Sequence, residues 1–132
     1  MIDVFNIRAG WATLAIGENT FCVSYLSNLK SEIDALLNLE SPYEVGNAYL
    51  EGEHQGDLHL VAYLIGDELT IIWQRVFCEE QKNITIMRFP FKEFKDKWKR
   101  LCLEMEREYI ENFLCPLDDE DRRNAIIEYK ER

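Results

Sequence analysis

The sequence predicts one α+β domain over residues 1–132. An antiparallel, meander-like sheet of about five to six strands carries one long and one short helix on one face. Two pairs of apolar segments, each interrupted by a short glycine-containing turn, indicate β-hairpins. Later in the chain, apolar residues recur at steps of three and four, as in an amphipathic helix. A chain of this length buries a single core without disulfides or metals.

The first half of the chain begins with strands and continues into the shorter helix. We expect strands over residues 2–9, 11–16 and 20–25. Gly17 and Asn19 suit a hairpin turn between the last two strands, because both residue types tolerate positive φ. A helix capped by Ser27 or Asn28 follows, with Glu32 near the position of a capping-box carboxylate. Its expected buried stripe comprises Leu29, Ile33, Leu36, Leu37 and Leu39.

The second half repeats the hairpin pattern. Apolar runs over residues 58–65 and 69–78 flank a turn at Gly66, and they predict two strands that are covered on at least one face. Residues 84–89 alternate and predict a further strand. Ile84, Ile86 and Arg88 point to one side of that strand, and Thr85, Met87 and Phe89 point to the other.

The long helix is expected over residues 91–114, between Pro90 and Pro116, because proline is tolerated at a helix start and cannot continue a helix. Its apolar stripe comprises Phe94, Trp98, Leu101, Cys102, Met105, Tyr109 and Phe113. Residues 117–132 are expected to form a short C-terminal helix or tail.

The charge of the chain points to a basic partner. There are 25 acidic and 15 basic residues, and the net charge is −10. Residues 1–60 carry nine acidic and two basic side chains, so most of the excess lies there. Such a charge opposes direct binding to nucleic acid or to an anionic membrane, and it favours a basic protein partner.

Cysteine usage and hydropathy predict a cytoplasmic location. Cys22, Cys78, Cys102 and Cys115 are widely spaced, which favours reduced thiols. The N-terminal residues MIDVFNIRAG lack the basic segment and apolar run of a signal peptide. No apolar run approaches the roughly 20 residues of a membrane-spanning helix.

The sequence contains no catalytic signature, and we expect no catalytic residues, metal or cofactor. Its four serines lie outside a GxSxG motif, and its glycines do not form a phosphate-binding loop. Glu53, His54, Asp57 and His59 are the one cluster of metal-competent side chains. His54 lies in a glycine-broken segment and His59 begins a strand, so we expect solvated side chains there rather than converging ligands.

The best candidate for a binding site is the irregular, acidic segment over residues 40–57, part of which (47–51) has the pattern of an edge strand. The predicted partner-binding residues are Tyr43, Glu44, Tyr49, Glu51, Glu53 and Asp57. Tyrosine buries a large area at low entropic cost, and carboxylates steer a basic partner toward it. The alternative is an ordinary solvated loop.

The long helix has an unusual charge order. Basic residues dominate its first half and acidic residues its second half, which opposes the helix dipole. Pairing with acidic segments elsewhere in the fold explains this order, and a charged interaction face is the alternative.

The chain resembles small acidic bacterial immunity proteins, which are encoded beside polymorphic or contact-dependent toxins. The resemblance rests on Gly10-Trp11-Ala12-Thr13-Leu14, on residues 21–28 (FCVSYLSN) and on residues 33–37 (IDALL). Phe91 and Phe94 match the Phe-x-x-Phe start of a later helix in these proteins.

The resemblance implies a non-enzymatic inhibitor that binds one cognate toxin, commonly a basic nuclease, and that needs no cofactor. The alternative is a small hydrolase or ligand-binding domain with a pocket between the long helix and the sheet. That pocket is expected to be lined by Trp73, Trp98 and Tyr109. A toxin-like reading frame immediately upstream distinguishes the two hypotheses, since only the inhibitor requires one.

Overall fold

The computed structural model of the protein describes residues 1–8, 11–24, 26–40, 44–52, 56–76, 81–108, 120, 121, 123, 124 and 127. The strands are β1 (Ile2–Arg8), β2 (Trp11–Ile16), β3 (Asn19–Ser24), β4 (Val45–Glu51), β5 (Asp57–Ile65), β6 (Glu68–Val76) and β7 (Gln81–Pro90). The helices are α1 (Leu26–Leu37) and α2 (Phe91–Glu108).

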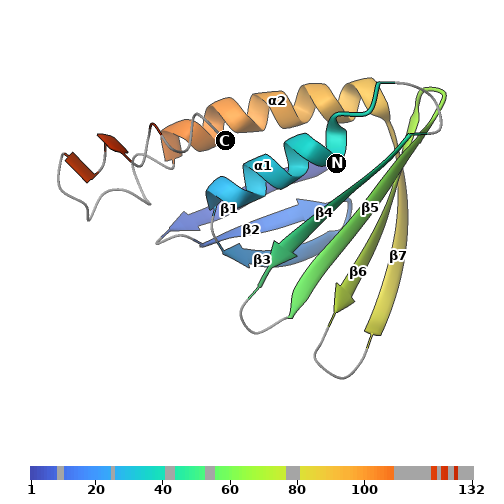
Figure 1. Ribbon diagram of the computed structural model, residues 1–132, viewed down its shortest axis with the longest axis horizontal. Helices are drawn as coiled ribbons and strands as arrows, with labels where there is room; N and C mark the ends of the chain where they lie inside the picture. The colour runs from blue at the N-terminus through green and yellow to red at the C-terminus, as the bar shows by residue number, and fades with distance from the viewer. Residues whose placement is uncertain are drawn as a thin grey trace.

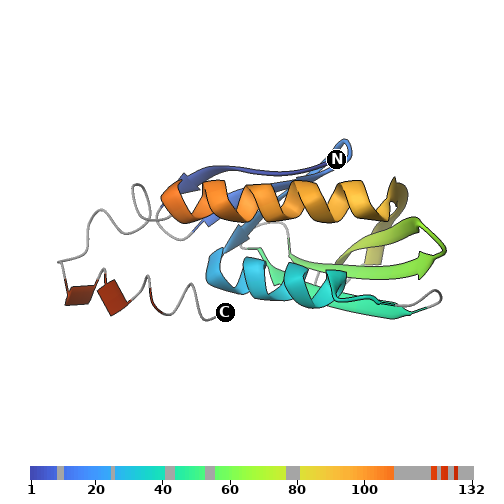
Figure 2. The ribbon, with the colours of Figure 1, turned by 90° about the horizontal axis from the view of Figure 1, so that it is seen from above.

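The predicted α+β class is confirmed, but the expected single sheet of about five to six strands is wrong. The described strands form two antiparallel sheets, one of three strands in the order β1-β2-β3 and one of four in the order β4-β5-β6-β7. Helix α1 connects the two sheets, and both helices lie side by side in Figures 1 and 2.

The chain divides into two sheets because both have an apolar face to bury, and each sheet covers part of the other. Phe21 of β3 meets Trp73 of β6 edge-on, with ring centroids 6.3 Å apart. The guanidinium of Arg75 lies 5.4 Å from the Phe21 ring centroid and donates a hydrogen bond to the carbonyl oxygen of Thr20. Asn19 donates a hydrogen bond to the sulfur of Met87, at 3.4 Å. The hairpin of β2 and β3 therefore lies across one face of the four-stranded sheet, which we call the inner face.

Helix α1 packs against β4, and α2 packs against β1 and β7. The predicted stripe of α1 is confirmed, since Leu29, Ile33, Leu36 and Leu37 are buried, and Leu39, two residues beyond the end of the helix, is buried as well. In α2, Phe91, Phe94, Trp98, Leu101 and Met105 are buried, and Cys102 is half-buried. Neither helix is long and apolar enough to cross a membrane in the described part of the chain.

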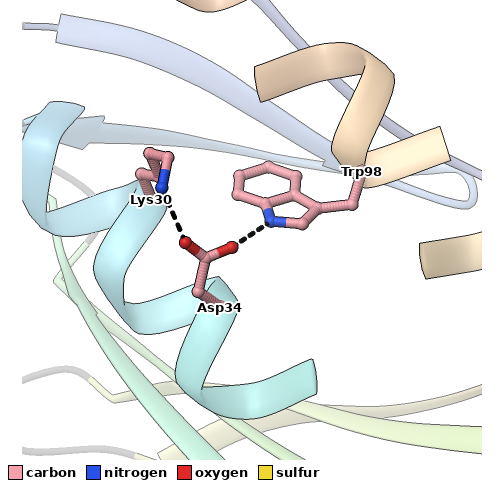
Figure 3. A network of polar contacts seen from close by, with 3 residues as sticks. All are labelled: Lys30, Asp34 and Trp98. Carbon is pink, nitrogen blue, oxygen red and sulfur yellow. Dashed lines mark hydrogen bonds and ion pairs between the residues drawn. The ribbon is translucent and has the colours of Figure 1, made fainter. Parts of the chain in front are cut away.

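A polar contact joins the two helices (Figure 3). The indole Nε1 of Trp98 donates a hydrogen bond to Asp34 Oδ1 at 2.8 Å, and Lys30 Nζ lies 2.8 Å from Asp34 Oδ2. Because Trp98 is only 3% exposed, its N–H needs a partner within the protein, and Asp34 supplies it.

Several predicted boundaries require correction. In the expected irregular segment over residues 40–57, strand β4 covers residues 45–51 and so begins two residues before the expected edge strand over 47–51, and Asp57 already belongs to β5. Helix α2 is described to Glu108, so the remainder of the expected helix to residue 114 lies outside the described residues. Tyr109, Phe113 and Cys115 also lie outside them. In the expected C-terminal helix or tail, residues 120, 121, 123, 124 and 127 have a helical backbone.

Candidate protein-binding surface

The predicted binding residues centre on β4, the first strand of the four-stranded sheet. Its side chains alternate between exposed and buried positions, with Ala48 and Leu50 in the core. Gly46 packs closely on α1: a Cβ built there would lie 2.8 Å from the carbonyl oxygen of Leu36. The close approach of helix and strand therefore requires glycine at this position.

Some backbone hydrogen-bonding groups on the free edge of β4 are paired with side chains from other elements. The backbone N–H of Tyr49 donates a hydrogen bond to Glu32 Oε2 at 3.3 Å, and the hydroxyl of Ser24 donates to the carbonyl oxygen of Glu51 at 3.4 Å. Glu32, which the sequence places near a capping-box position, thus bonds to the backbone of an edge strand. Such contacts protect an edge strand from pairing with another chain.

The structure brings three of the six predicted residues together. Glu51 and Asp57 are directly paired across β4 and β5. The hydroxyl of Tyr49 donates a hydrogen bond to Asp57 Oδ2. Tyr49 is 49% exposed, so its ring presents apolar area to solvent while its hydroxyl is held by the neighbouring strand. His59, paired with Tyr49, places its ring centroid 6.5 Å away.

The carboxylates change the acidity of the phenol. The hydrogen bond to Asp57 raises the pKa of Tyr49 above its usual 10.0, and the slight desolvation and the negative charges of Asp57 and Glu51 act in the same direction. The phenol is therefore held as a neutral donor beside two carboxylates, and the cluster concentrates negative charge at one end of the strand.

Of the other three predicted residues, the structure describes Glu44, which lies away from this cluster. The carboxylate of Glu44 accepts a hydrogen bond from the backbone N–H of Glu40 at 2.7 Å. Glu44 comes just before the opposite end of β4, about 23 Å from Glu51 at the usual rise per strand residue. Tyr43 and Glu53 lie outside the described residues, so the structure tests neither of them.

The side of the four-stranded sheet that carries Tyr49 is rich in apolar side chains. Residues that pair across the strands form rows on this side: Asn47, Val61, Ile72 and Ile86 in one row, and Tyr49, His59, Gln74 and Ile84 in the next. We call this side the outer face, and its apolar side chains include Val45, Tyr49, Val61, Tyr63, Ile65, Ile72, Val76, Ile84 and Ile86. Val45 and Ile84 are each 65% exposed, and Ile86 is 54% exposed.

Sequence reasoning missed this face as a binding candidate, although the signal was present. The alternation in residues 84–89 separated Ile84 and Ile86 from Met87 and Phe89. Only the pairing of the strands shows that Met87 and Phe89 point to the inner face, which leaves the two isoleucines outside.

Within the described residues, no group of three or more histidine, cysteine or acidic side chains is arranged to hold a metal ion. His59 lies on the same side of the sheet as Tyr49, and His54 is outside the described part of the chain.

The thiol of Cys102 is held in its neutral form. Burial and the nearby negative charge of Asp34 raise its pKa to about 11, and these two effects together outweigh the positive charge of Lys30, which lowers the pKa. This thiol is a poor nucleophile at neutral pH.

The structure describes two of the three residues expected to line a pocket between the long helix and the sheet. Trp73 is 2% exposed and packs on Phe21, so it fills the interior. Trp98 borders a small cleft of about 150 Å³ between α1 and α2. Tyr109 lies outside the described residues. A larger open cleft of about 870 Å³ lies at the start of α2, and acidic and basic side chains from several elements line it.

Comparisons with protein-family models, with curated proteins and with solved structures find no match.

Proposed function

We propose that this protein is a non-enzymatic inhibitor, an immunity protein that binds and neutralises a cognate bacterial toxin, most simply a basic nuclease. The observation that carries the proposal is the cluster of Tyr49 and Glu51 on the edge strand β4 with Asp57 on the neighbouring strand β5. A partly exposed aromatic ring lies there beside two carboxylates. The net charge of −10 supports a basic partner, and the resemblance to immunity proteins gives the class of partner.

The arrangement suits recognition of a basic surface. Glu51 and Asp57 come from two neighbouring strands, so the fold itself fixes their spacing. The hydrogen bond from Tyr49 to Asp57 holds the ring in one orientation before the partner arrives, and this lowers the entropy lost on binding. The hydrolase or ligand-binding alternative has less support, because Trp73 and Trp98 are buried in the interior.

The test is a protection assay with the protein encoded immediately upstream of this chain. Cells that express the upstream protein alone are expected to stop growing, and co-expression of this chain should restore growth. The triple variant Tyr49→Ala, Glu51→Lys, Asp57→Lys should lose protection. The control Leu103→Lys changes a side chain that is 72% exposed on α2, so it should protect fully. An upstream protein that neither harms cells nor binds this chain contradicts the proposal.

A further inference from the structure

The outer face of the four-stranded sheet is an apolar surface without a covering element among the described residues. The β2–β3 hairpin meets this sheet through Trp73, Arg75 and Met87, all of which point to the inner face. The helices and the three-stranded sheet gather on one side of the four-stranded sheet in Figures 1 and 2. Nine large apolar side chains are exposed among the described residues, and five of them lie on the opposite side: Val45, Tyr49, Ile65, Ile84 and Ile86.

This clustering differs from the scattered apolar exposure of an ordinary protein surface. Ile72 on β6 is directly paired with Ile86 on β7, and Ile84 lies two residues before Ile86 on β7, so it points to the same side. These β-branched side chains are stiff, so they lose little entropy when a partner covers them. The outer face is therefore preorganised to bury apolar area.

The charges around the outer face distinguish between two candidate occupants, a second copy of this chain and a basic protein. Glu51 and Asp57 lie at one end of the face, whereas Glu68 and Arg88 at the other end are 3.8 Å apart and offset one another. The excess charge that borders the face is thus negative in the described part of the chain. A second copy would also bring a second net charge of −10, and the two copies would repel. A basic partner turns the same charges into attraction.

We propose that the outer face is the main contact surface for an apolar patch rimmed by lysine and arginine on a basic protein. Ile84 and Ile86 are its anchors, Glu51 and Asp57 are its charged border, and the neutral phenol of Tyr49 lies beside that border. The inference rests on the proposed function, and it moves the energetic centre of the interface from the acidic cluster to β6 and β7. Apolar side chains near the centre of an interface dominate its affinity, whereas border charges mainly set the association rate.

The experiment compares Ile84→Lys, Ile86→Lys and the double variant with wild type and with Leu103→Lys. The parent residues Ile84, Ile86 and Leu103 are more than half exposed, so each variant should retain its fold and melting temperature. In surface plasmon resonance against the upstream protein, each isoleucine variant should raise Kd at least about tenfold, chiefly through the off-rate. Leu103→Lys should bind like wild type. Wild-type affinity in the double variant would overturn the inference, while the proposed function would stand if the acidic triple variant lost binding.

If the upstream protein does not bind this chain, a second measurement tests the inference. Wild type, the double isoleucine variant and Leu103→Lys then serve as baits in a lysate of the source cells, with captured proteins quantified by mass spectrometry. We expect a basic protein that wild type and Leu103→Lys retain and the double variant loses. Equal capture by all three baits, or an acidic protein lost by the double variant, overturns the inference. Sedimentation of wild type as a dimer that the double variant abolishes also overturns it, because a second copy would then cover the face.

Discussion

Trp98 and Asp34 join the two helices through a hydrogen bond in which the indole Nε1 lies 2.8 Å from Asp34 Oδ1 (Figure 3). The Asp34 side chain is 42% exposed, and its second oxygen pairs with Lys30 one turn earlier on α1. One oxygen of the carboxylate thus accepts the hydrogen bond of the buried indole, and the other pairs with the Lys30 ammonium near solvent. This contact fixes how α2 lies against α1, and the rest of the Trp98 side chain fills the core.

Removing the Trp98 side chain should destabilise the fold strongly. Trp98→Ala should lower the free energy of unfolding by about 3–5 kcal/mol, because the large cavity cannot fully collapse. Trp98→Phe should keep most of the packing and lose the hydrogen bond, with a smaller loss of about 1–2 kcal/mol. Urea denaturation followed by circular dichroism measures both values. A Trp98→Ala protein as stable as wild type would show that this face of α2 is not buried.

The junction between the two sheets should be sensitive to a single methyl group at Gly52. A Cβ at this position would lie 2.5 Å from Phe21 Cζ and 2.8 Å from the carbonyl oxygens of Cys22 and Gly56. Gly52→Ala should therefore lower stability by about 1–3 kcal/mol, because two backbone atoms must move. The control Asn47→Ala changes an exposed side chain on β4 and should stay within about 0.5 kcal/mol of wild type. Equal stability of the two variants would contradict the close packing at this junction.

Cys102 should react slowly with alkylating reagents. Burial raises its pKa to about 11, so its thiolate fraction at pH 8 is about a hundredfold lower than that of an unperturbed thiol with a pKa of 9.0. The thiol is favoured in the folded state, so its contribution to stability is complete below pH 9 and is lost as pH rises toward 11. Iodoacetamide labelling with mass spectrometry, with and without urea, measures the protection. Equal labelling rates in the two conditions would contradict the burial of this side chain.

Tyr49 should ionise above the normal range for tyrosine, because its phenol donates to Asp57 and lies near Glu51. Asp57→Asn removes a full negative charge beside the phenol, so the variant should have a lower Tyr49 pKa than wild type. An NMR titration of protein carrying ¹³C-labelled tyrosine, with Tyr49→Phe to assign the signal, follows this pKa. An unchanged Tyr49 pKa in Asp57→Asn would show that the hydrogen bond does not form in solution.

Local patterns in the sequence predict the helices and hairpins well. The turns at Gly17 and Gly66 occur where the sequence places them, and both glycines have the positive φ that favours this residue. The stripe of α1 is buried as expected. The division into two sheets is not visible in the sequence, because it depends on contacts between distant segments, such as Phe21 with Trp73. Alternation along a strand identifies its two faces but does not identify what covers either face.

The candidate site is predicted in part. Composition and position draw attention to Tyr49, Glu51 and Asp57, and strand pairing brings these three together. Glu44 is separated from them because residues between them form an extended strand rather than a compact loop. Ile84 and Ile86 were assigned to one side of a strand, but their exposure depends on the opposite side packing inward. A sequence pattern cannot supply that information.

The most direct test of the central claim is the salt dependence of binding between this chain and the protein encoded upstream, measured by surface plasmon resonance. The association rate of wild type should fall steeply between 0.01 M and 0.1 M salt, because the Debye length shrinks from about 30 Å to about 10 Å. The variant Tyr49→Ala, Glu51→Gln, Asp57→Asn should associate more slowly, depend less on salt and dissociate faster. Association that is insensitive to salt, together with unchanged affinity in this variant, would contradict the account.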